Sequence, residues 1–289
     1  MRLHASQSRI IFDTVDLHSL RAHREAQISI DPEAREKAWQ KEDLEYALIR
    51  QADETWVTSS VEQKLLQDKW PEKSIQLVSN IVDIPGSNTP FELRRDFLFI
   101  GDFQHTPNTD AVLFFLKKIY PMVKERLRGA KFYIIGDKTP PAVVTLAGEN
   151  VVITGLQRDV RPFFESVKLS VAPLRFGAGV KGKINQSMAW GVPVVATSVA
   201  VEGMELTFGE DVLVADEPEE FAKALVTLYE SPELWNRLSR NGIEKTRLLY
   251  SAEVAREKLE RLFNNQDVQP VEVLSESLKQ RDPAVGISA

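Results

Sequence analysis

The hydrophobic positions in the second half of the chain form short apolar runs that alternate with amphipathic stretches. The apolar runs predict strands at residues 97–101, 131–135, 151–154, 169–172, 193–196 and 212–214. The amphipathic stretches predict helices at 110–127, 161–166, 183–190, 218–230, 232–250 and 252–263. Apolar strands that alternate with helices are typical of a parallel sheet covered on both faces. The pattern therefore predicts an α/β, doubly wound, Rossmann-like C-terminal domain.

The first part of the chain carries a shorter version of the same pattern. Strands are expected at 9–13, 55–58 and 75–78, with one helix at 32–52 and another that begins at the Ser59/Ser60 cap. These elements are few for a complete domain. A linker rich in proline, glycine and polar residues follows at 84–90.

This organisation divides the chain into three parts. We expect an incomplete α/β N-terminal domain at residues 1–88 and the Rossmann-like C-terminal domain at residues 89–264. Residues 265–289 mix polar residues and prolines without an apolar period, so a disordered tail is expected there.

Composition narrows the classes of function. The 289 residues are 43% hydrophobic and 27% charged, as in soluble proteins of one or two domains. There is no cysteine, and the four histidines have no metal-ligand spacing, so no thiol chemistry and no metal site are expected. The net charge of −6 argues against general nucleic-acid binding. Because no apolar run reaches the roughly 18 residues that span a bilayer, a cytoplasmic protein is expected.

The strongest chemical signal lies at residues 176–197, where two glycines and two lysines precede a predicted helix and a buried strand. Gly177 and Gly179 allow backbone N–H groups to approach phosphate oxygens, and the helix N-terminus adds partial positive charge. Lys181 and Lys183 supply full charges, although Lys181 is equally well explained as a solvated loop lysine. Arg175 is either a phosphate contact or a surface arginine.

Other polar residues and glycines follow the ends of predicted strands. Gly101 and Asp102 follow the first strand of the C-terminal domain, where ligands of doubly wound sheets bind; a tight turn also explains such a glycine. Asn108 is expected to cap the next helix. Asp16 and His18 follow the first strand of the chain. A histidine there can share a proton with an acceptor hydroxyl or contact a phosphate, and capping or salt bridging is the alternative.

Four motifs together resemble the retaining glycosyltransferases of family 4, enzymes with the GT-B fold. They are FIGDF at 99–103 with PN at 107–108, YIIGD at 133–137, VITG at 152–155 with DVRP at 159–162, and the segment 177–197 continued by EGM at 202–204. The resemblance covers residues 10–262. It lacks on the order of 100 residues with which the family's N-terminal domain opens, so the N-terminal domain is interpreted as truncated.

The resemblance implies a GT-B-type fold and transfer of a sugar, with retention of configuration, from a nucleoside diphosphate sugar to a glycan or lipid-linked acceptor. It also implies cell-surface polysaccharide synthesis, peripheral association with the inner face of the cytoplasmic membrane, and no metal or other cofactor. The C-terminal domain would hold the donor and the N-terminal domain the acceptor. Sugar-nucleotide epimerases and glycogen-phosphorylase-like enzymes share the architecture, but their acid–base carboxylates or pyridoxal lysine have no matching motif here.

Under this resemblance, Asp16 and His18 are the candidate catalytic residues. The residues expected to contact the donor or its phosphates are Gly101, Asp102, Arg175, Gly177, Ala178, Gly179, Lys181, Lys183, Gln186 and Glu202. Glu202 matches a cleft-rim position and is expected to contact donor or lysine, with a plain surface glutamate as the alternative. The family commonly has two glutamates where this chain has Ala178 and Gln186. Gln186 can still hydrogen-bond a ribose diol, but the lost charge leaves a non-catalytic nucleotide-sugar-binding protein as the alternative function.

Overall fold

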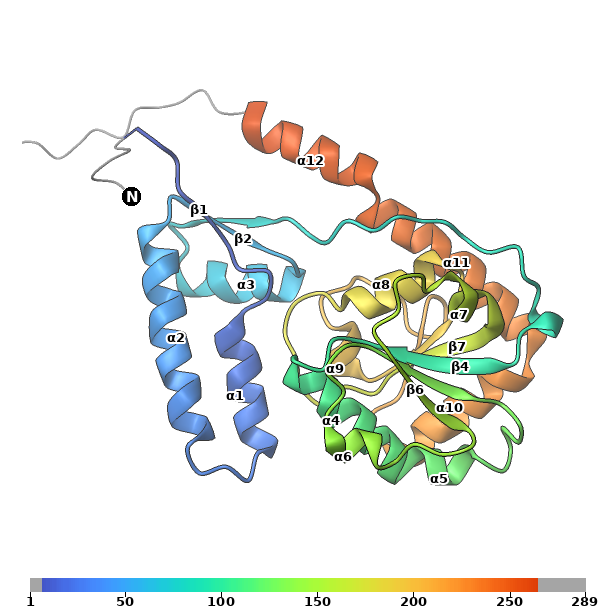
Figure 1. The fold of residues 1–289 in the computed structure, drawn as a ribbon. Coiled ribbons are helices and arrows are strands. Elements are labelled where there is room, and N and C mark those ends of the chain that lie inside the picture. The colour runs from blue at the N-terminus through green and yellow to red at the C-terminus, as the bar shows by residue number, and fades with distance from the viewer. Residues whose placement is uncertain (1–6, 265–289) are drawn as a thin grey trace, which may run out of the picture.

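A computed structural model describes residues 7–264 and shows an α/β protein with two separate parallel sheets (Figure 1). The N-terminal sheet has the order β1-β2-β3, formed by β1 (Ile11–Asp13), β2 (Glu54–Val57) and β3 (Ser74–Leu77). Its helices are α1 (His18–Ile28), α2 (Ala34–Gln51) and α3 (Ser60–Lys69). The predicted cap of α3 is confirmed, because the Ser59 hydroxyl accepts a 3.2 Å hydrogen bond from the Glu62 backbone N–H.

The C-terminal sheet has the strand order β6-β5-β4-β7-β8-β9, with every neighbouring pair parallel. Its strands are β4 (Asp96–Ile100), β5 (Phe132–Ile135), β6 (Val151–Gly155), β7 (Val167–Ala172), β8 (Val194–Ala196) and β9 (Leu213–Val214). The predicted doubly wound domain is thereby confirmed. The strand order reverses between β4 and β7, and the crevice outside the carboxyl ends of such a pair is where this architecture binds ligands.

Helices cover both faces of this sheet. They are α4 (Thr106–Phe114), a π-helical turn (Phe115–Ile119), α5 (Tyr120–Val123), α6 (Pro141–Val144), α7 (Arg161–Ser166), α8 (Gly182–Ala189), α9 (Ser198–Val201), α10 (Pro218–Glu230), α11 (Pro232–Tyr250) and α12 (Ala252–Asn264). The helix expected at 110–127 begins four residues earlier, because Pro107 is tolerated in a first helical turn. The short α6 and α9 were not predicted.

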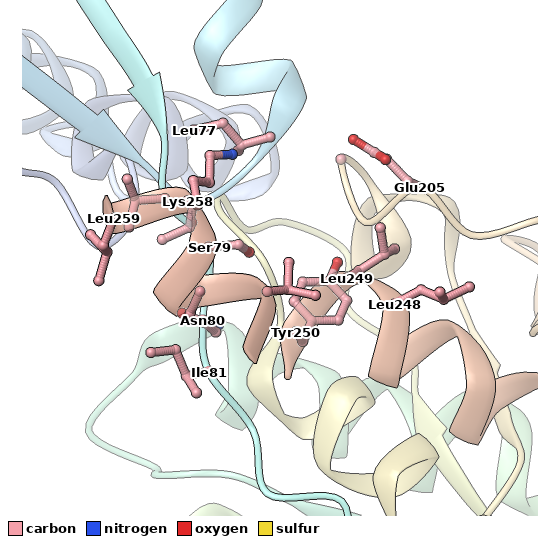
Figure 2. A pocket seen from close by; sticks show the side chains of 15 residues that line it. Leu77, Ser79, Asn80, Ile81, Glu205, Leu248, Leu249, Tyr250, Lys258 and Leu259 are labelled. Atoms are coloured by element: carbon pink, nitrogen blue, oxygen red, sulfur yellow. The ribbon is translucent and has the colours of Figure 1, made fainter. Parts of the chain in front are cut away.

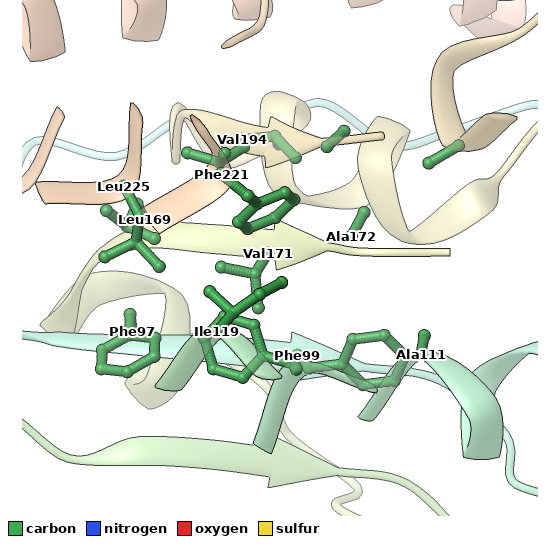
Figure 3. Close-up of a cluster of buried hydrophobic side chains, with 14 of the residues drawn as sticks. Phe97, Phe99, Ala111, Ile119, Leu169, Val171, Ala172, Val194, Phe221 and Leu225 are labelled. Atoms are coloured by element: carbon green, nitrogen blue, oxygen red, sulfur yellow. The ribbon is translucent and has the colours of Figure 1, made fainter. Parts of the chain in front are cut away.

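The core of the C-terminal domain is built from aromatic and branched side chains between the sheet and its helices (Figure 3). Phe97, Phe115, Phe132 and Phe221 are fully buried, and the Phe97 and Phe132 rings stack with centroids 4.8 Å apart. Burial of this kind stabilises a side chain by about 1.5–3 kcal/mol. The core therefore fixes the ends of β4 and β7 that face the N-terminal domain.

Between β3 and the 3₁₀ turn Phe91–Leu93 the chain runs without helix or strand, and we propose that the domain boundary lies there, at residues 88 and 89. Helix α12 crosses from α11 back toward the N-terminal sheet (Figure 1). A largely apolar cavity of about 310 Å³ lies between residues 77–81 and the α11–α12 corner (Figure 2). The predicted tail at residues 265–289 lies outside the described residues.

The two domains also touch directly at Gly203, which has φ +69° in the turn after α9. A Cβ atom added there would lie 2.6 Å from the Ser59 Cβ. Gly209 is a matched control, because its φ is +83° but nothing lies within 4 Å of an added Cβ.

We expect Gly209→Ala to lower the free energy of unfolding by about 1 kcal/mol through backbone strain alone. Gly203→Ala should lower it by roughly 2–4 kcal/mol, because the clash with the N-terminal domain adds to that strain. Urea denaturation of both variants measures the difference. Equal losses would show that the Gly203–Ser59 contact imposes no constraint.

Candidate active site at the domain interface

A cavity of about 230 Å³ lies where β4 and β7 end and the N-terminal domain approaches. Both domains line it. The lining residues are Val15, Asp16, Asn80, His105, Leu174, Gly177, Ala178, Val180, Lys181, Gly182 and Lys183. The structure thus brings five of the twelve predicted site residues into the cavity lining, namely Asp16, Gly177, Ala178, Lys181 and Lys183. Gly179 lies next to them in the same loop and packs against the N-terminal domain.

 The C-terminal domain contributes Gly177, Ala178, Lys181 and Lys183 to this lining, and the N-terminal domain contributes Asp16.

The glycine loop packs tightly against the N-terminal domain. Gly179 has φ +64°, and an added Cβ would lie 2.8 Å from the Asp16 Cβ and 2.9 Å from the Thr58 hydroxyl oxygen. The Val180 N–H donates to that same hydroxyl at 3.3 Å, and the hydroxyl donates to the Val15 carbonyl at 2.9 Å. Only glycine combines this backbone conformation with this close approach.

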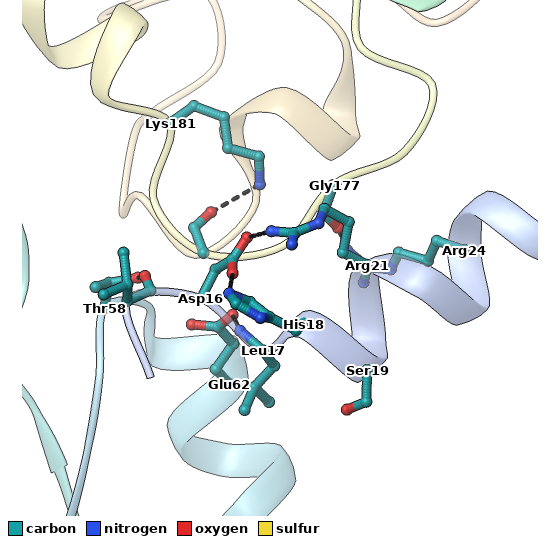
Figure 4. A network of polar contacts seen from close by, with 12 residues as sticks. Asp16, Leu17, His18, Ser19, Arg21, Arg24, Thr58, Glu62, Gly177 and Lys181 are labelled. Carbon is teal, nitrogen blue, oxygen red and sulfur yellow. Dashed lines mark hydrogen bonds and ion pairs between the residues drawn. The ribbon is translucent and has the colours of Figure 1, made fainter. Parts of the chain in front are cut away.

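Lys181 is buried beneath the loop, with 6% of its surface exposed. Its ammonium donates a 2.7 Å hydrogen bond to the Gly179 carbonyl, which holds the loop (Figure 4). Burial lowers the pKa of Lys181 to about 8, and the nearby Glu202 opposes that shift. The interpretation of Lys181 as a solvated loop lysine is therefore wrong, because this side chain lies between the two domains.

Lys183 lies in the first turn of α8 and is half-buried. Its ammonium donates a 2.7 Å hydrogen bond to the Asn108 amide oxygen and lies 5.4 Å from the centre of the Phe99 ring. Burial, and then the charge of Lys181, lower the pKa of Lys183 to about 7. No side chain among the described residues caps this end of α8, so its first N–H groups stay available to an anion.

Across the cavity, Asp16 is the buried centre of a small charge network (Figure 4). Its carboxylate accepts from the Arg21 guanidinium and contacts the His18 Nε2 at 3.0 Å. His18 therefore makes the predicted salt-bridging contact, with Asp16 as its partner. The His18 side chain is 57% exposed. The preceding residue, Val15, has φ +60°, an unusual conformation for a β-branched residue and a form of backbone strain found near functional sites.

Arg24, a residue that the sequence did not single out as a site residue, joins the two domains. Its guanidinium forms a bidentate ion pair with Glu202 at 2.6 and 2.9 Å and also donates to the Gly177 carbonyl at 2.8 Å. The direct partner of Glu202 is therefore an arginine of the other domain, where a lysine or donor was expected. Sequence shows only that Arg21 and Arg24 share one helix face, since they lie three residues apart.

Other predicted site residues lie outside the cavity lining. The Arg175 Nε donates to Asp110 at 2.9 Å on the surface, and Gln186 lies half-buried on α8. Gly101 lies against the Asn108 amide, since an added Cβ would lie 2.7 Å from its nitrogen. The Asp102 carbonyl accepts a 2.7 Å hydrogen bond from that nitrogen.

The expected capping role of Asn108 is wrong. Helix α4 begins at Thr106, and the Asn108 side chain reaches Lys183 and the Asp102 carbonyl in place of the helix end. A prediction of a cap depends on where the helix begins, and Pro107 moved that start to an earlier residue.

His105 is a cavity residue that sequence reasoning missed as a site candidate. Burial, and then the positive charge of Arg21, lower the pKa of His105 to about 4, so its imidazole is neutral near pH 7. A neutral imidazole offers one hydrogen-bond donor and one acceptor to a ligand. Its position directly after the β4 loop was the available signal, because this loop borders the switch point of the sheet.

Residues 7–264 contain neither a membrane-spanning helix nor a metal-binding cluster. No helix there combines the length and apolar character of a membrane-spanning segment. In the same residues, no three His, Cys, Asp or Glu side chains are grouped so that they could hold a metal ion.

Comparison with known sequences points to one family. The profile of the family described as "Glycosyl transferases group 1" matches residues 94–231, which include the glycine loop and both lysines. An uncharacterized 44.6 kDa protein in the cps region of Klebsiella pneumoniae is 27% identical over 165 residues, covering 53% of this chain and 42% of that protein.

Solved structures share the fold. TarM from S. aureus, in a complex with fondaparinux, alpha-GlcNAc-glycerol and UDP, is similar with a TM-score of 0.67 and 18% identity, covering 78% of this chain and 46% of TarM. Sucrose-phosphate synthase from Thermosynechococcus elongatus has a TM-score of 0.68 and 16% identity, covering 91% of this chain and 69% of the synthase. HepE from Anabaena, in a complex with UDP and glucose, has a TM-score of 0.69 and 12% identity, covering 91% of this chain and 73% of HepE.

These similarities confirm the GT-B-type α/β fold that was predicted. The family match supports an enzyme of the glycosyltransferase type. The chain spans less than half the length of the Klebsiella relative and of TarM, at 42% and 46%.

The lowered lysine pKa values predict pH-dependent anion binding. The ammonium groups of Lys183 and Lys181 lose their protons as the pH rises through about 7 and about 8, so less positive charge faces the cavity. We expect the Kd for sulfate, whose charge is constant over this range, to rise by about 10-fold or more between pH 6 and pH 9. Isothermal titration calorimetry measures the Kd, and Lys183→Met should leave only the part of the pH dependence that Lys181 contributes. A sulfate Kd that does not change with pH would show that the two lysines do not bind the anion.

Proposed function

We propose that this chain takes part in glycosyl transfer, with a nucleoside diphosphate sugar bound in the interdomain cavity and its sugar passed to a glycan or lipid-linked acceptor. We further propose retention of configuration, a role in cell-surface polysaccharide synthesis, and action in the cytoplasm at the inner face of the membrane. The Klebsiella relative, described as lying in a cps region, supports the pathway proposal.

The observation that carries the proposal is the concentration of anion-binding groups on one wall of the cavity. Gly177 and Ala178 line this wall, the uncapped start of α8 contributes its N–H groups, and Lys183 and Lys181 contribute ammonium groups. A departing diphosphate gains negative charge in the transition state, so donors fixed in advance stabilise it. The groups lie at the switch point of the sheet, where a nucleotide is expected.

Uridine is our first choice for the donor base. The TarM and HepE structures are both complexes with UDP, and these proteins share the fold of this chain. The choice of sugar stays open, although HepE is described with glucose and with UDP-glucose.

On the acceptor side, we propose that Asp16 and His18 act as a pair. An Nε2–H that donates to Asp16 leaves the His18 Nδ1 free to take the proton of an acceptor hydroxyl. For retention, the acceptor oxygen bonds to the anomeric carbon on the same face that the diphosphate leaves, and the bond from that carbon to the diphosphate oxygen breaks. The nucleoside diphosphate then leaves with the electron pair. Arg21 donates to the Asp16 carboxylate and holds it in place.

The alternative proposal is a protein that binds nucleotide sugars without turnover. Ala178 lines the cavity where the family commonly has a glutamate, and Gln186 lies outside the lining. Neither residue supplies a carboxylate for the donor.

Release of UDP from UDP-glucose, with and without oligosaccharide acceptors, separates the two proposals. An enzyme releases UDP and gives a product whose anomeric configuration is read by NMR. A binding protein shows affinity for UDP with no turnover, and that result would overturn the proposed transfer.

We expect His18→Ala to lower kcat by about 100-fold to 10,000-fold, as for loss of a general base, with UDP affinity unchanged. His23→Ala is the matched control, because His23 does not line the cavity and its Nε2 lies 2.8 Å from the Glu42 carboxylate. Steady-state rates of UDP release measure both variants. If His18→Ala retained full kcat, the acceptor-side role of His18 would be refuted.

We expect saturating UDP, at about 100 times its Kd, to raise the Tm by roughly 5–10 °C, because UDP binds only the folded protein. Lys183→Met should remove most of that shift. Lys124→Met serves as the control, since Lys124 is exposed on the far end of α5. Differential scanning fluorimetry measures the shifts; an unchanged shift in Lys183→Met would place the diphosphate elsewhere.

A further inference from the structure

A chain of polar contacts runs from the end of β4 to the first turn of α8. The Asn108 side-chain nitrogen donates to the Asp102 carbonyl at 2.7 Å, and the Asn108 side-chain oxygen accepts from the Lys183 ammonium at 2.7 Å. Asn108 is 3% exposed, so its amide has fixed partners and little freedom. Two elements that are 75 residues apart in the sequence are joined through this one side chain.

Gly101 completes the arrangement. A Cβ atom on residue 101 would lie 2.7 Å from the Asn108 side-chain nitrogen and 2.9 Å from its amide carbon. Glycine at this position therefore leaves room for the amide, and with its backbone N–H bonded to the Ile135 carbonyl at 3.0 Å it stays in register with the sheet. The predicted donor contacts Gly101 and Asp102 thus lie where they support the asparagine.

We infer that Asn108 is a positioning residue, which holds the Lys183 ammonium toward the diphosphate site and sets its proton affinity. This inference rests on the proposed function for the identity of the ligand. A lysine side chain has several rotatable bonds, so a fixed acceptor removes the freedom that the ligand would otherwise have to restrict. An amide oxygen does this without a negative charge that would repel a phosphate.

The titratable groups around Lys183 come from three segments, but the acceptor of its ammonium hydrogen bond is the Asn108 amide oxygen. The glycine loop contributes Lys181, and the segment before α4 contributes His105 and Asp102, whose carboxylate accepts from the Gln104 N–H at 2.9 Å. The N-terminal domain contributes Asp16, which is bound to Arg21 and His18.

The test compares the Lys183 pKa in three variants, from NMR of protein with ¹³C- and ¹⁵N-labelled lysine, with the signal assigned by its loss in Lys183→Met. Asn108→Asp should raise that pKa by about 1–3 units, because it places a carboxylate against the ammonium. Asn108→Ala should lower it, because the acceptor is gone. Asn241→Asp is the control, since Asn241 is half-buried on α11 and its side chain donates to the Glu210 carbonyl at 2.8 Å.

UDP binding gives the second readout. Asn108→Ala should weaken UDP by roughly 10-fold at pH 6.5, as for loss of a hydrogen bond to a charged group, and Gly101→Ala should do the same by displacing the amide. Asn108→Asp is nearly isosteric and is expected to fold. The Lys183 pKa in that variant therefore tests the positioning role even if Asn108→Ala does not fold. The inference is overturned if the Lys183 pKa is the same in Asn108→Asp as in the unmodified protein. If that pKa responds but the protein binds no UDP, the proposed function fails and the positioning role stands.

Discussion

The structure depends on two ammonium groups, the buried one of Lys181 and the half-buried one of Lys183, beside an uncapped helix N-terminus. Lys181 and Lys183 direct their hydrogen bonds to a carbonyl and to an amide oxygen, rather than to carboxylates. Burying a positive charge without an ionised partner costs free energy, and the lowered pKa values of both lysines express that cost. An anion that enters the cavity relieves it. The site is therefore unfavourable when empty and suited to a ligand with negative charge.

The close approach of the two domains creates this environment. Gly179 and Gly203 both have positive φ and both lie against side chains of the N-terminal domain where a Cβ would not fit. The bidentate Arg24–Glu202 pair adds a charged contact at the same interface. Water is excluded from Lys181 because these contacts hold the glycine loop against the segment that carries Asp16. Donor-binding and acceptor-side residues consequently belong to one packed unit.

Much of the fold could be predicted because it follows from local patterns. The apolar runs at Phe97 and Val194 could only be buried strands, and Ser59 capped its helix as expected. Gly177, Lys181 and Lys183 also line the cavity as predicted, because their role follows from backbone freedom and from nearness to a helix start.

The remaining site residues depend on contacts between distant parts of the chain, and the sequence gives no direct measure of those. Arg24 meets Glu202 across 178 positions, and Asn108 meets Lys183 across 75. Arg175 looked equally suitable for a phosphate, yet its guanidinium pairs with Asp110. The burial of Lys181 was likewise hidden, because it arises from the packing of one domain on the other.

The most direct test of this account is a crystal structure of the protein soaked with UDP. The account predicts the diphosphate between the backbone of residues 177–179, the first turn of α8 and the Lys183 ammonium, with the uridine toward the carboxyl ends of β4 and β5. Density for the diphosphate at another place, such as the apolar cavity beside α12, or an interdomain cavity left empty at saturating UDP, would contradict it.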